Sequence, residues 1–407
     1  MSRREPSAGF RGATIVLGVT GGIAAYKAAD LTSNLVQAGA DVHVVMTDGG
    51  TRFVQPLTFE ALTRNRVYTS VFEGWYEDSA GHVTLARNAD VVLVAPASAN
   101  TIAKMAHGRV DDMLGAVLLA TEAPIIVAPA MEHHMWHHPA TRHNIETLGA
   151  RGVHIVEPES GHLASGAFGD GRLAGLDRLL AAIRLRLGAG GPLTGRSVVV
   201  TAGGTREAID PVRYLGNRSS GRMGVALAHA AIDAGAQVTL IAGPTLEQVP
   251  RDIDMQRVES ARDMDAAVQA AASVADVLIM AAAVTDFRPE EQHDQKLKKR
   301  AGEDRLTLEL VKNPDIIAGV NGASVLKIGF AAETENLLHN AAEKLEAKDL
   351  TMIVANDAVS TIGHDRVRAT LLFRDGRDPL QLPELSKDEA ARCVVDELPA
   401  LLEGHSP

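Results

Sequence analysis

The sequence predicts an α/β protein made of two doubly wound parallel-sheet domains in tandem. An apolar strand that runs into a glycine turn and then into an amphipathic helix occurs twice, at Thr14–Met46 and at Ser197–Ala242. In both places the glycines allow a sharp turn and direct unpaired amide groups at the helix start toward an anion. Two such openings in one chain indicate two phosphate-bearing ligands and two active sites.

The remaining elements follow the rhythm of a parallel sheet covered on both faces. In the first half, strand-like runs at Ala89–Ala95 and Ile125–Ala128 alternate with helical stretches. In the second half we expect strands near Val238, Val277, Val325 and Met352, a β-rich excursion at Arg305–Val311 and Val367–Phe373, and a final helix at Lys387–Leu402. Each half should therefore be Rossmann-like or flavodoxin-like.

The boundary between the halves is a change in composition. A helical stretch at Leu176–Leu187 gives way to Gly188–Gly195, which is rich in glycine and proline and is expected to bury nothing. A new apolar strand begins at Ser197. We expect a first domain over residues 10–187, a linker over 188–195 and a second domain over 196–407.

Composition excludes several classes of partner. The chain has 407 residues and a formal net charge of −11, which disfavours nucleic acid and leaves any anionic ligand dependent on local donors. Its apolar runs are shorter than the roughly 20 residues that span a bilayer. A single cysteine, Cys393, forms no intrachain disulfide and fits a reducing compartment. We expect a cytoplasmic protein that binds neither nucleic acid nor membrane.

Neither glycine turn matches the dinucleotide-binding pattern G-x-G-x-x-G. The first reads GVTGG and the second TAGGT, and the next strand of the second half ends at Ala242 and Gly243 without an acid for a ribose diol. An NAD-dependent dehydrogenase is therefore disfavoured, although Asp48 keeps this alternative open in the first half.

Longer motifs are more specific. The first half carries PASANT at 96–101, PAMEHHMW at 129–136 and GHLASGAFGDGR at 161–172, and the second carries NRSSGRMG at 217–224, AAAVTDFRP at 281–289, KLKK at 296–299, KNPDI at 312–316 and GFAAET at 329–334. In this order, over nearly the whole chain, they resemble the bifunctional phosphopantothenoylcysteine decarboxylase/phosphopantothenate-cysteine ligases of coenzyme A biosynthesis. The resemblance implies that 4'-phosphopantothenate and cysteine are converted to 4'-phosphopantetheine in two steps.

The first half resembles the flavin-containing cysteine decarboxylases, which implies trimers with FMN at the subunit contacts. In that family FMN accepts electrons from the thiol-bearing carbon of the substrate, a thioaldehyde forms, CO2 leaves and the electrons return. The resemblance implies that His82 is catalytic and that FMN is lined by Thr20, Gly22, Thr47, Ser98, Asn100 and Thr101, with Met131 nearby. A lone histidine before an apolar run is more often structural, but the surrounding motifs favour catalysis.

Two positions depart from the decarboxylase pattern. Glu132 replaces the asparagine of P-A-M-N-x-x-M and would repel the substrate carboxylate unless it is protonated or turned away. Ser165 replaces the cysteine of A-C-G-x-x-G-x-G-R, which donates a proton in the family. Arg172 keeps its place and can bind an anionic end of the substrate, whereas Cys393 should be a buried structural thiol in the other domain. An active ligase fused to a flavin-binding regulatory domain is the alternative.

For the second half, the resemblance implies that CTP activates the substrate carboxylate as an acyl-cytidylate, which cysteine then attacks. This chemistry needs positive charge around a triphosphate and a metal ion, Mg2+. Asn217 and Lys296 would be catalytic. The nucleotide pocket would comprise Met280, Ala281, Ala282, Asp286, Pro314, Asp315, Ile316, Ile317 and Phe330, with Lys296, Lys344 and Lys348 at the phosphates. The alternatives are a solvated basic run at Lys296–Arg300 and ATP in place of CTP.

Two smaller patterns bear on ligands. Lys344 and Lys348 are spaced i,i+4, so they can face one anion from one helix despite mild repulsion. The histidines His133, His134, His137 and His138 invite a zinc interpretation, but we find no cysteine or suitably spaced carboxylate to complete a tetrahedral set, so a polar connection beside the flavin is favoured. The metal ligands stay unassigned, and we expect a homo-oligomer with trimeric decarboxylase and dimeric ligase contacts.

Overall fold

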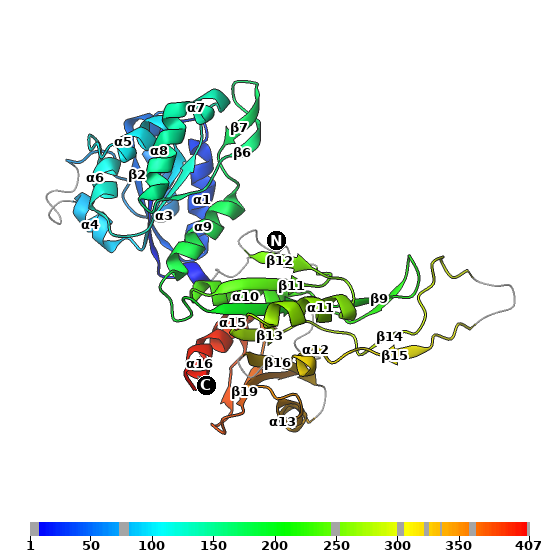
Figure 1. Ribbon diagram of the computed structural model, residues 1–407. Coiled ribbons are helices and arrows are strands. Elements are labelled where there is room, and N and C mark those ends of the chain that lie inside the picture. Colours follow the sequence, from blue (N-terminus) through cyan, green and yellow to red (C-terminus); the bar gives the residue numbers. More distant parts are fainter. Residues whose placement is uncertain are drawn as a thin grey trace. The chain divides into compact units, whose positions relative to one another are not determined.

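The structure is a computed structural model that describes residues 8–72, 81–245, 253–298, 305–320, 325–333, 336–357 and 364–404 (Figure 1). Three residues of the sequence motifs and basic run, Lys299, Arg300 and Thr334, lie outside this range. The chain divides into two compact units, Met1–Leu187 and Gly188–Pro407. Each unit is an α/β domain with a mainly parallel sheet, so the expected fold class is confirmed.

Unit 1 alternates strands and helices along most of its length. Its elements are η1 (Ala8–Phe10), β1 (Thr14–Val19), α1 (Ala25–Gln37), β2 (Asp41–Met46), α2 (Asp48–Thr51), α3 (Pro56–Thr63), α4 (Gly81–Asn88), β3 (Val91–Ala97), α5 (Ala99–Ala106), α6 (Met113–Ala120), β4 (Ile125–Pro129), α7 (His133–His137), α8 (Pro139–Ala150), β5 (His154–Ile155), β6 (Glu159–His162), β7 (Phe168–Arg172) and α9 (Leu176–Gly188).

The sheet of unit 1 is parallel with the order β2-β1-β3-β4-β5. Side chains of α1, α3 and α9 pack with one face of it, and those of α4 to α8 pack with the other. Because β3 is covered on both sides, all seven of its residues are buried, which explains its uninterrupted apolar sequence. The antiparallel hairpin β6–β7 lies outside the sheet.

Unit 2 adds antiparallel pieces to the same plan. Its elements are β8 (Ser197–Ala202), β9 (Arg206–Ala208), β10 (Tyr214–Gly216), α10 (Arg222–Asp233), β11 (Gln237–Ala242), β12 (Asp254–Arg257), α11 (Ala261–Ala272), β13 (Val277–Met280), β14 (Phe287–Pro289), β15 (Leu310–Lys312), α12 (Ile316–Gly319), β16 (Leu326–Glu333), α13 (Leu337–Ala347), β17 (Met352–Asp357), β18 (Arg366–Val367), β19 (Ala369–Phe373), β20 (Leu380–Gln381), β21 (Leu385–Ser386), α15 (Lys387–Asp396) and α16 (Leu398–Gly404).

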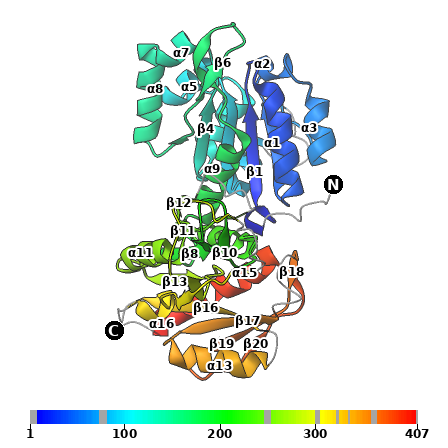
Figure 2. The ribbon, with the colours of Figure 1, turned by 90° about the vertical axis from the view of Figure 1, so that its right-hand side faces the viewer.

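The main sheet of unit 2 has the order β12-β11-β8-β13-β16-β17-β19-β20. Its first six strands are parallel, and β19 and β20 extend it in the antiparallel sense. Figure 2 shows β13, β16, β17 and β19 following one another across it. Helices α10, α15 and α16 pack with one face and α11, α12 and α13 with the other, so this domain is also doubly wound.

An arm projects from this sheet. The hairpin β9–β10 and the antiparallel pair β14–β15 are separate from the main sheet, and β9 contacts β14 (Figure 1). We call residues 206–216, 287–298 and 305–312 the arm.

Three details differ from the sequence-based expectations. The segment 188–195 was expected to bury nothing, but Leu193 is fully buried in the core of unit 2 and its N–H donates to the Ala234 carbonyl. The final helix is two helices, because the Pro399 ring would clash in a continuous helix but is tolerated in the first turn of α16. In the first part of the β-rich excursion, Arg305–Val311, the strand begins only at Leu310, whereas the second part, Val367–Phe373, lies almost entirely in β18 and β19.

The single thiol of the sequence is half-buried. Cys393 on α15 packs against the core of unit 2, and burial raises the pKa of its thiol. No helix among the described residues is both long and apolar enough to cross a bilayer.

A glycine sets the distance between α10 and β8. A Cβ on Gly224 would lie 2.5 Å from the Ala202 Cβ and 2.7 Å from the Thr201 carbonyl oxygen. These neighbours belong to a buried strand, so the helix would have to move away from the sheet.

Gly224→Ala should therefore destabilise unit 2 by about 1 to 3 kcal/mol, the usual result of overpacking. Scanning calorimetry should show the melting temperature of unit 2 falling by roughly 2 to 4 °C per kcal/mol. Gly404→Ala in α16 is the matched control, because a Cβ there meets no atom within 4 Å. Equal melting temperatures for both variants would contradict this packing argument.

Candidate active sites

The first candidate site lies where β1 and β3 end in unit 1. These neighbouring strands are followed by helices on opposite faces of the sheet, α1 on one and α5 on the other. A crevice for ligands opens at such a switch point, outside the carboxyl ends of the strands. The GVTGG turn and the PASANT motif are the two loops at this point, so the structure brings together two motifs that are far apart in sequence.

Thr20 joins these two loops. It is fully buried, its hydroxyl donates to the Pro96 carbonyl at 2.7 Å, and the same oxygen accepts from the Ser98 N–H at 2.9 Å. Both roles of the hydroxyl are thus occupied within the protein. Thr20 holds the loop after β3 in place, rather than presenting its hydroxyl to a ligand.

Ser98 and Thr101 form the start of α5. The Ser98 Oγ accepts from the Thr101 N–H at 3.3 Å, and the two hydroxyl oxygens are 3.1 Å apart. Asn100, in the first turn, is exposed. A helix start with exposed polar side chains favours a negatively charged ligand group.

The glycine turn packs against the loop after β2. A Cβ on Gly21 would lie 3.0 Å from the Gly49 Cα, and one on Gly50 would lie 2.5 Å from the Val19 carbonyl oxygen. Thr47 caps α2 by accepting from the Gly50 N–H at 3.2 Å. Gly22, by contrast, would place a Cβ in open space, so a ligand can approach the backbone there.

His82 is in the first turn of α4. In a parallel α/β sheet the helices run opposite to the strands, so the start of α4 lies at the edge where the strands end. Its imidazole is half-buried, and its Nδ1 atom is buried without a hydrogen-bond partner among the described residues. A buried ring nitrogen with no partner is unusual and indicates a group reserved for a ligand or for proton transfer.

The hairpin β6–β7 is fastened to the loop after β4. The Met131 N–H donates to the Gly171 carbonyl at 3.0 Å, and the Asp170 N–H donates to the His133 Nδ1 at 3.1 Å. Ser165 is exposed at the turn of the hairpin. The Arg172 side chain lies over Gly161 of the opposite strand. The hairpin thus carries two of the three predicted substrate residues, Ser165 and Arg172, while its base is fixed.

Glu132 is turned toward α7. Its Oε2 accepts from the His134 N–H at 2.7 Å, which makes it the N-cap of that helix. This is one of the two arrangements that would relieve repulsion of a substrate carboxylate.

The structure corrects the expectation that no carboxylate lies near the histidine cluster. A carboxylate does approach it, because Asp170 of β7 lies 3.0 Å from the His137 Nε2, and ligand atoms of His133, His137 and Asp170 are within 4.8 Å of one another. However, the His133 Nδ1 accepts from the Asp170 N–H, so the neutral ring carries its proton on Nε2. Hydrogen bonds from Ser160 and then His137 lower the pKa of Asp170. We describe these groups as a polar connection between α7 and the hairpin.

The second candidate site lies where β8 and β13 end in unit 2. Its first six strands have the order 3-2-1-4-5-6, counted along the chain, so the switch point falls between these two. The Ala283 N–H donates to the Gly203 carbonyl at 2.8 Å, and the Thr205 and Thr285 hydroxyls are 2.9 Å apart. The TAGGT turn and the AAAVTDFRP motif are thereby connected directly.

Asn217 lies beside this connection. Its Nδ2 donates to the Val284 carbonyl at 2.9 Å. The backbone carbonyl oxygen of Asn217 would be 2.8 Å from a Cβ on Gly204. Its Oδ1 atom is the remaining polar group of the amide.

Four of the predicted nucleotide residues lie on or directly after two neighbouring strands, β13 and β16. Met280 is buried at the end of β13, with Ala281 and Ala282 half-buried after it, and Phe330 is half-buried on the adjacent β16. The Ala282 N–H donates to the Thr201 hydroxyl at 3.1 Å. Asp286 is exposed.

The turn Pro314–Ile317 is fixed by a buried asparagine. The Asn313 Nδ2 donates to the Thr285 carbonyl at 2.7 Å and its N–H to the Asp286 carbonyl at 2.8 Å. Ile316 and Ile317 are in the core, so only their backbone can contact a nucleotide. Asn313 was missed as a site residue, although it lies within the KNPDI motif; its place directly before a proline was the available signal.

The predicted lysines differ in their surroundings. Lys348 follows α13 and its Nζ is 3.0 Å from the Asp315 Oδ2, so part of its charge is compensated. Lys344 is in the last turn of α13, and Lys296 is exposed on the arm. The contacts therefore link Lys348 with the turn after Pro314.

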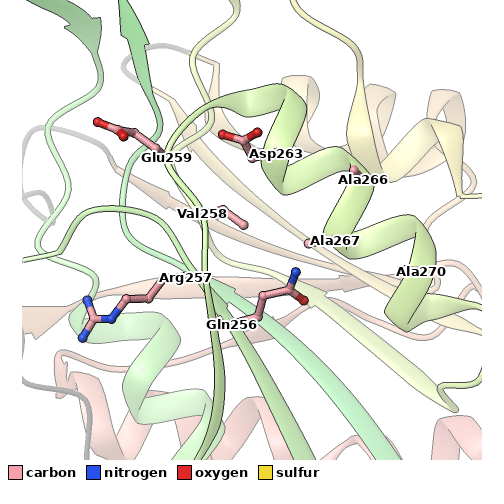
Figure 3. Close-up of a pocket in the computed structure, with 8 residues that line it drawn as sticks. All are labelled: Gln256, Arg257, Val258, Glu259, Asp263, Ala266, Ala267 and Ala270. Atoms are coloured by element: carbon pink, nitrogen blue, oxygen red, sulfur yellow. The ribbon is translucent and has the colours of Figure 1, made fainter. Parts of the chain in front are cut away.

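A separate hollow of about 630 Å3 lies between β12 and α11 (Figure 3). Arg257, Glu259 and Asp263 supply its charged side chains, and alanines of α11 form one wall. It is lined by none of the residues that the sequence motifs predicted. Asp263 belongs to the capping box of α11, where hydrogen bonds from Ser260 lower its pKa.

Comparison with known proteins agrees with this division. The family described as DNA/pantothenate metabolism flavoprotein C-terminal domain matches residues 193–401, and the family described as flavoprotein matches residues 3–188. The crystal structure of the C-terminal domain of coenzyme A biosynthesis bifunctional protein CoaBC is 39% identical and covers 53% of this chain and 99% of its own, with a TM-score of 0.46. The FMN-dependent cysteine decarboxylase SpaF is 34% identical and covers 40% and 92%, with a TM-score of 0.36.

Two relatives align with nearly the whole chain. The coenzyme A biosynthesis bifunctional protein CoaBC of Bacillus subtilis is 45% identical over 395 residues, which is 95% of this chain and 97% of the relative. The protein of the same description from Escherichia coli is 39% identical over 394 residues, again 95% and 97%. With this identity over almost its full length, the chain belongs to the family of coenzyme A biosynthesis bifunctional proteins.

Proposed function

We propose that the chain performs two consecutive steps of coenzyme A biosynthesis. Unit 2 joins the carboxylate of 4'-phosphopantothenate to the amine of cysteine while CTP is converted to CMP and pyrophosphate. Unit 1 then removes the cysteine carboxyl group as CO2, which leaves 4'-phosphopantetheine. The observation that carries this proposal is that each unit has its own switch point, where ligands bind in folds of this kind, and that the motif residues converge there.

In this proposal residues 10–187 are the decarboxylase, 196–407 the ligase, and 188–195 the connection. Family membership supports both activities, and the alternative of a flavin-binding regulatory domain without decarboxylase activity is not favoured. We further infer that the protein acts in the cytoplasm.

The switch point of unit 1 offers groups that suit FMN. The start of α5 at Ser98 suits a phosphate or a ring oxygen, and the open space at Gly22 lets a flat group approach the backbone. Thr47, Asn100 and Met131 come from the neighbouring loops. When bound, FMN supplies a reversible two-electron acceptor for the thiol-bearing carbon.

The protein's own groups would manage protons and charge in this reaction. The His82 Nδ1, which has no hydrogen-bond partner among the described residues, can exchange a proton with the substrate. Arg172 can bind an anionic end, and Ser165 occupies the position of the family's cysteine without the acidity of a thiol. Because Glu132 caps α7, its charge is directed at the helix start rather than at the substrate.

In the ligase, Asn217 would orient the attacking amine. Its Nδ2 is committed to the Val284 carbonyl, so the Oδ1 is left to accept from the amine of cysteine. The triphosphate needs nearby cations because the whole chain is acidic, and Lys348 already pairs with Asp315. Lys296 and Lys344 would complete this charge, together with a Mg2+ ion that binds phosphate oxygens.

Exposed apolar side chains support the predicted oligomer. In unit 1, Tyr26 and Leu57 are 61% and 71% exposed, next to Ile23 and Phe53 in the segments that follow β1 and β2. On the arm, six large apolar residues are at least one third exposed: Val212, Tyr214, Phe287, Leu306, Leu308 and Leu310. Clusters of this kind mark protein contacts, so we propose trimeric contacts through unit 1 and dimeric contacts through the arm.

The purified protein should be yellow and carry about one FMN per chain. The start of α5 and the open approach at Gly22 are the physical reasons. Absorbance near the flavin bands, after added FMN and desalting, measures this. A colourless protein that retains no FMN would remove the decarboxylase assignment.

Asn217→Asp should block amide formation while pyrophosphate is still released from CTP. The carboxylate would face the Val284 carbonyl oxygen and lose the hydrogen bond that orients the side chain. Pyrophosphate and amide are measured in the same reaction, and the melting temperature serves as the folding control. An unchanged yield of amide would exclude Asn217 from aminolysis.

Lys296→Gln should reduce ligase turnover roughly tenfold to a hundredfold and leave the decarboxylase unchanged. A charge-assisted contact with phosphate is worth about 1.5 to 3 kcal/mol. Lys298→Gln, two residues away and also exposed, is the matched control and should change turnover less than about threefold. Equal losses in both half-reactions, or in both variants, would contradict a specific role for Lys296.

A further inference from the structure

The arm contains a buried carboxylate. Asp210, in the turn between β9 and β10, is only 2% exposed, although Val212 and Tyr214 beside it are mostly exposed. Its Oδ1 accepts from the N–H groups of Val212 at 2.8 Å and Arg213 at 2.9 Å. One oxygen of the carboxylate therefore closes the hairpin turn.

The other oxygen reaches a different part of the arm. The Asp210 Oδ2 accepts from the Leu297 N–H at 3.1 Å, and the Arg213 Nε lies 3.3 Å from the same oxygen. The Arg213 Nη2 donates to the Leu297 carbonyl at 2.5 Å. Both backbone polar groups of Leu297 are thus bound by the Asp210–Arg213 pair, across 87 residues of sequence.

A second backbone contact strengthens this connection. The His293 N–H donates to the Ile209 carbonyl at 3.0 Å. The segment from His293 to Leu297 has no helix or strand of its own, so these bonds to the hairpin determine its course.

The carboxylate is suited to bind as an anion. Burial alone would raise the pKa of Asp210, but the N–H groups of Val212, Leu297 and Arg213 and the Arg213 charge lower it overall. Asp210 therefore accepts charge-assisted hydrogen bonds at neutral pH, and these are about twice as strong as neutral ones.

Lys296 directly precedes the residue that is held. We propose that Asp210 is a positioning residue of the ligase, which fixes the Leu297 backbone so that Lys296 is presented to the triphosphate of CTP. This inference rests on the proposed role of Lys296. Asp210 itself is buried and acts through the backbone that it holds.

Asp210→Asn tests the proposal with little change in volume. The amide keeps one acceptor and places an NH2 donor against one set of the N–H groups. We expect kcat/KM for CTP to fall about tenfold, in line with loss of one charge-assisted bond. In the Lys296→Gln background the same substitution should change kcat/KM less than about twofold, because the residue that it positions is gone.

The rate of trypsin cleavage after Lys298 measures how firmly this segment is held, and it does not depend on ligase activity. Asp210→Asn should accelerate this cleavage of the full chain, because the bonds to Leu297 are weakened. Asp276→Asn is the matched control: that carboxylate also binds a backbone N–H, of Ser197 at 2.7 Å, and an arginine, Arg196 at 2.9 Å, but at the start of β8. It should lower the melting temperature without affecting either readout.

The outcomes separate the two proposals. An equal fold-loss from Asp210→Asn with and without Lys296 would overturn positioning, and so would an unchanged rate of cleavage. If Lys296→Gln alone has no effect, the role of Lys296 fails, and faster cleavage in Asp210→Asn would still show that the carboxylate holds the segment. If Asp210→Asn does not fold, Leu297→Pro removes the same hydrogen bond from its donor side and should give the same two results.

Discussion

Each candidate site contains a buried threonine whose hydroxyl links the ends of two neighbouring parallel strands. In unit 1 the Thr20 hydroxyl binds the Pro96 carbonyl and the Ser98 N–H. In unit 2 the Thr201 hydroxyl accepts from the Ala282 N–H at the equivalent place. At a switch point the segments that follow the two strands turn toward opposite faces of the sheet. Their backbone N–H and C=O groups therefore lose the partners that neighbouring strands supply elsewhere. The Thr20 hydroxyl donates to one backbone group and accepts from another, and the Thr201 hydroxyl accepts from one, so these backbone groups have partners before a ligand arrives.

Several predicted site residues lie on segments outside the main sheets, and polar contacts hold these segments in place. The hairpin β6–β7 is fastened through Asp170 and the α7 histidines, and the arm through Asp210 and Arg213. Two-stranded segments have too few residues to form a hydrophobic core of their own, so directional hydrogen bonds determine their position. Their apolar side chains stay exposed, which suits contacts with further subunits.

Glu132 and Ser165, which depart from the decarboxylase pattern, lie in different structural surroundings. The Glu132 carboxylate has a structural partner at the start of α7, where a negative charge is favourable, so it is compatible with an anionic substrate nearby. Ser165 is exposed at the tip of the hairpin. Its hydroxyl is a much weaker acid than a thiol, so we expect either that another group or water delivers the proton in the second half of the decarboxylation or that this reduction is slow.

The sequence by itself determined the fold class, the two-domain plan and the motifs at both crevices, because apolar periodicity and glycine turns are local properties. It also indicated Ser98, Asn217 and Lys296 as site residues by resemblance. Only the tertiary structure decided how these residues act. Three features depend on contacts between segments 33 to 87 residues apart: whether the Thr20 hydroxyl faces a ligand or a carbonyl, whether a carboxylate reaches the histidine cluster, and which residue holds the backbone next to Lys296. Pairings over such distances leave no local pattern in the sequence. The residues next to an aspartate do not reveal whether a distant segment will bury it.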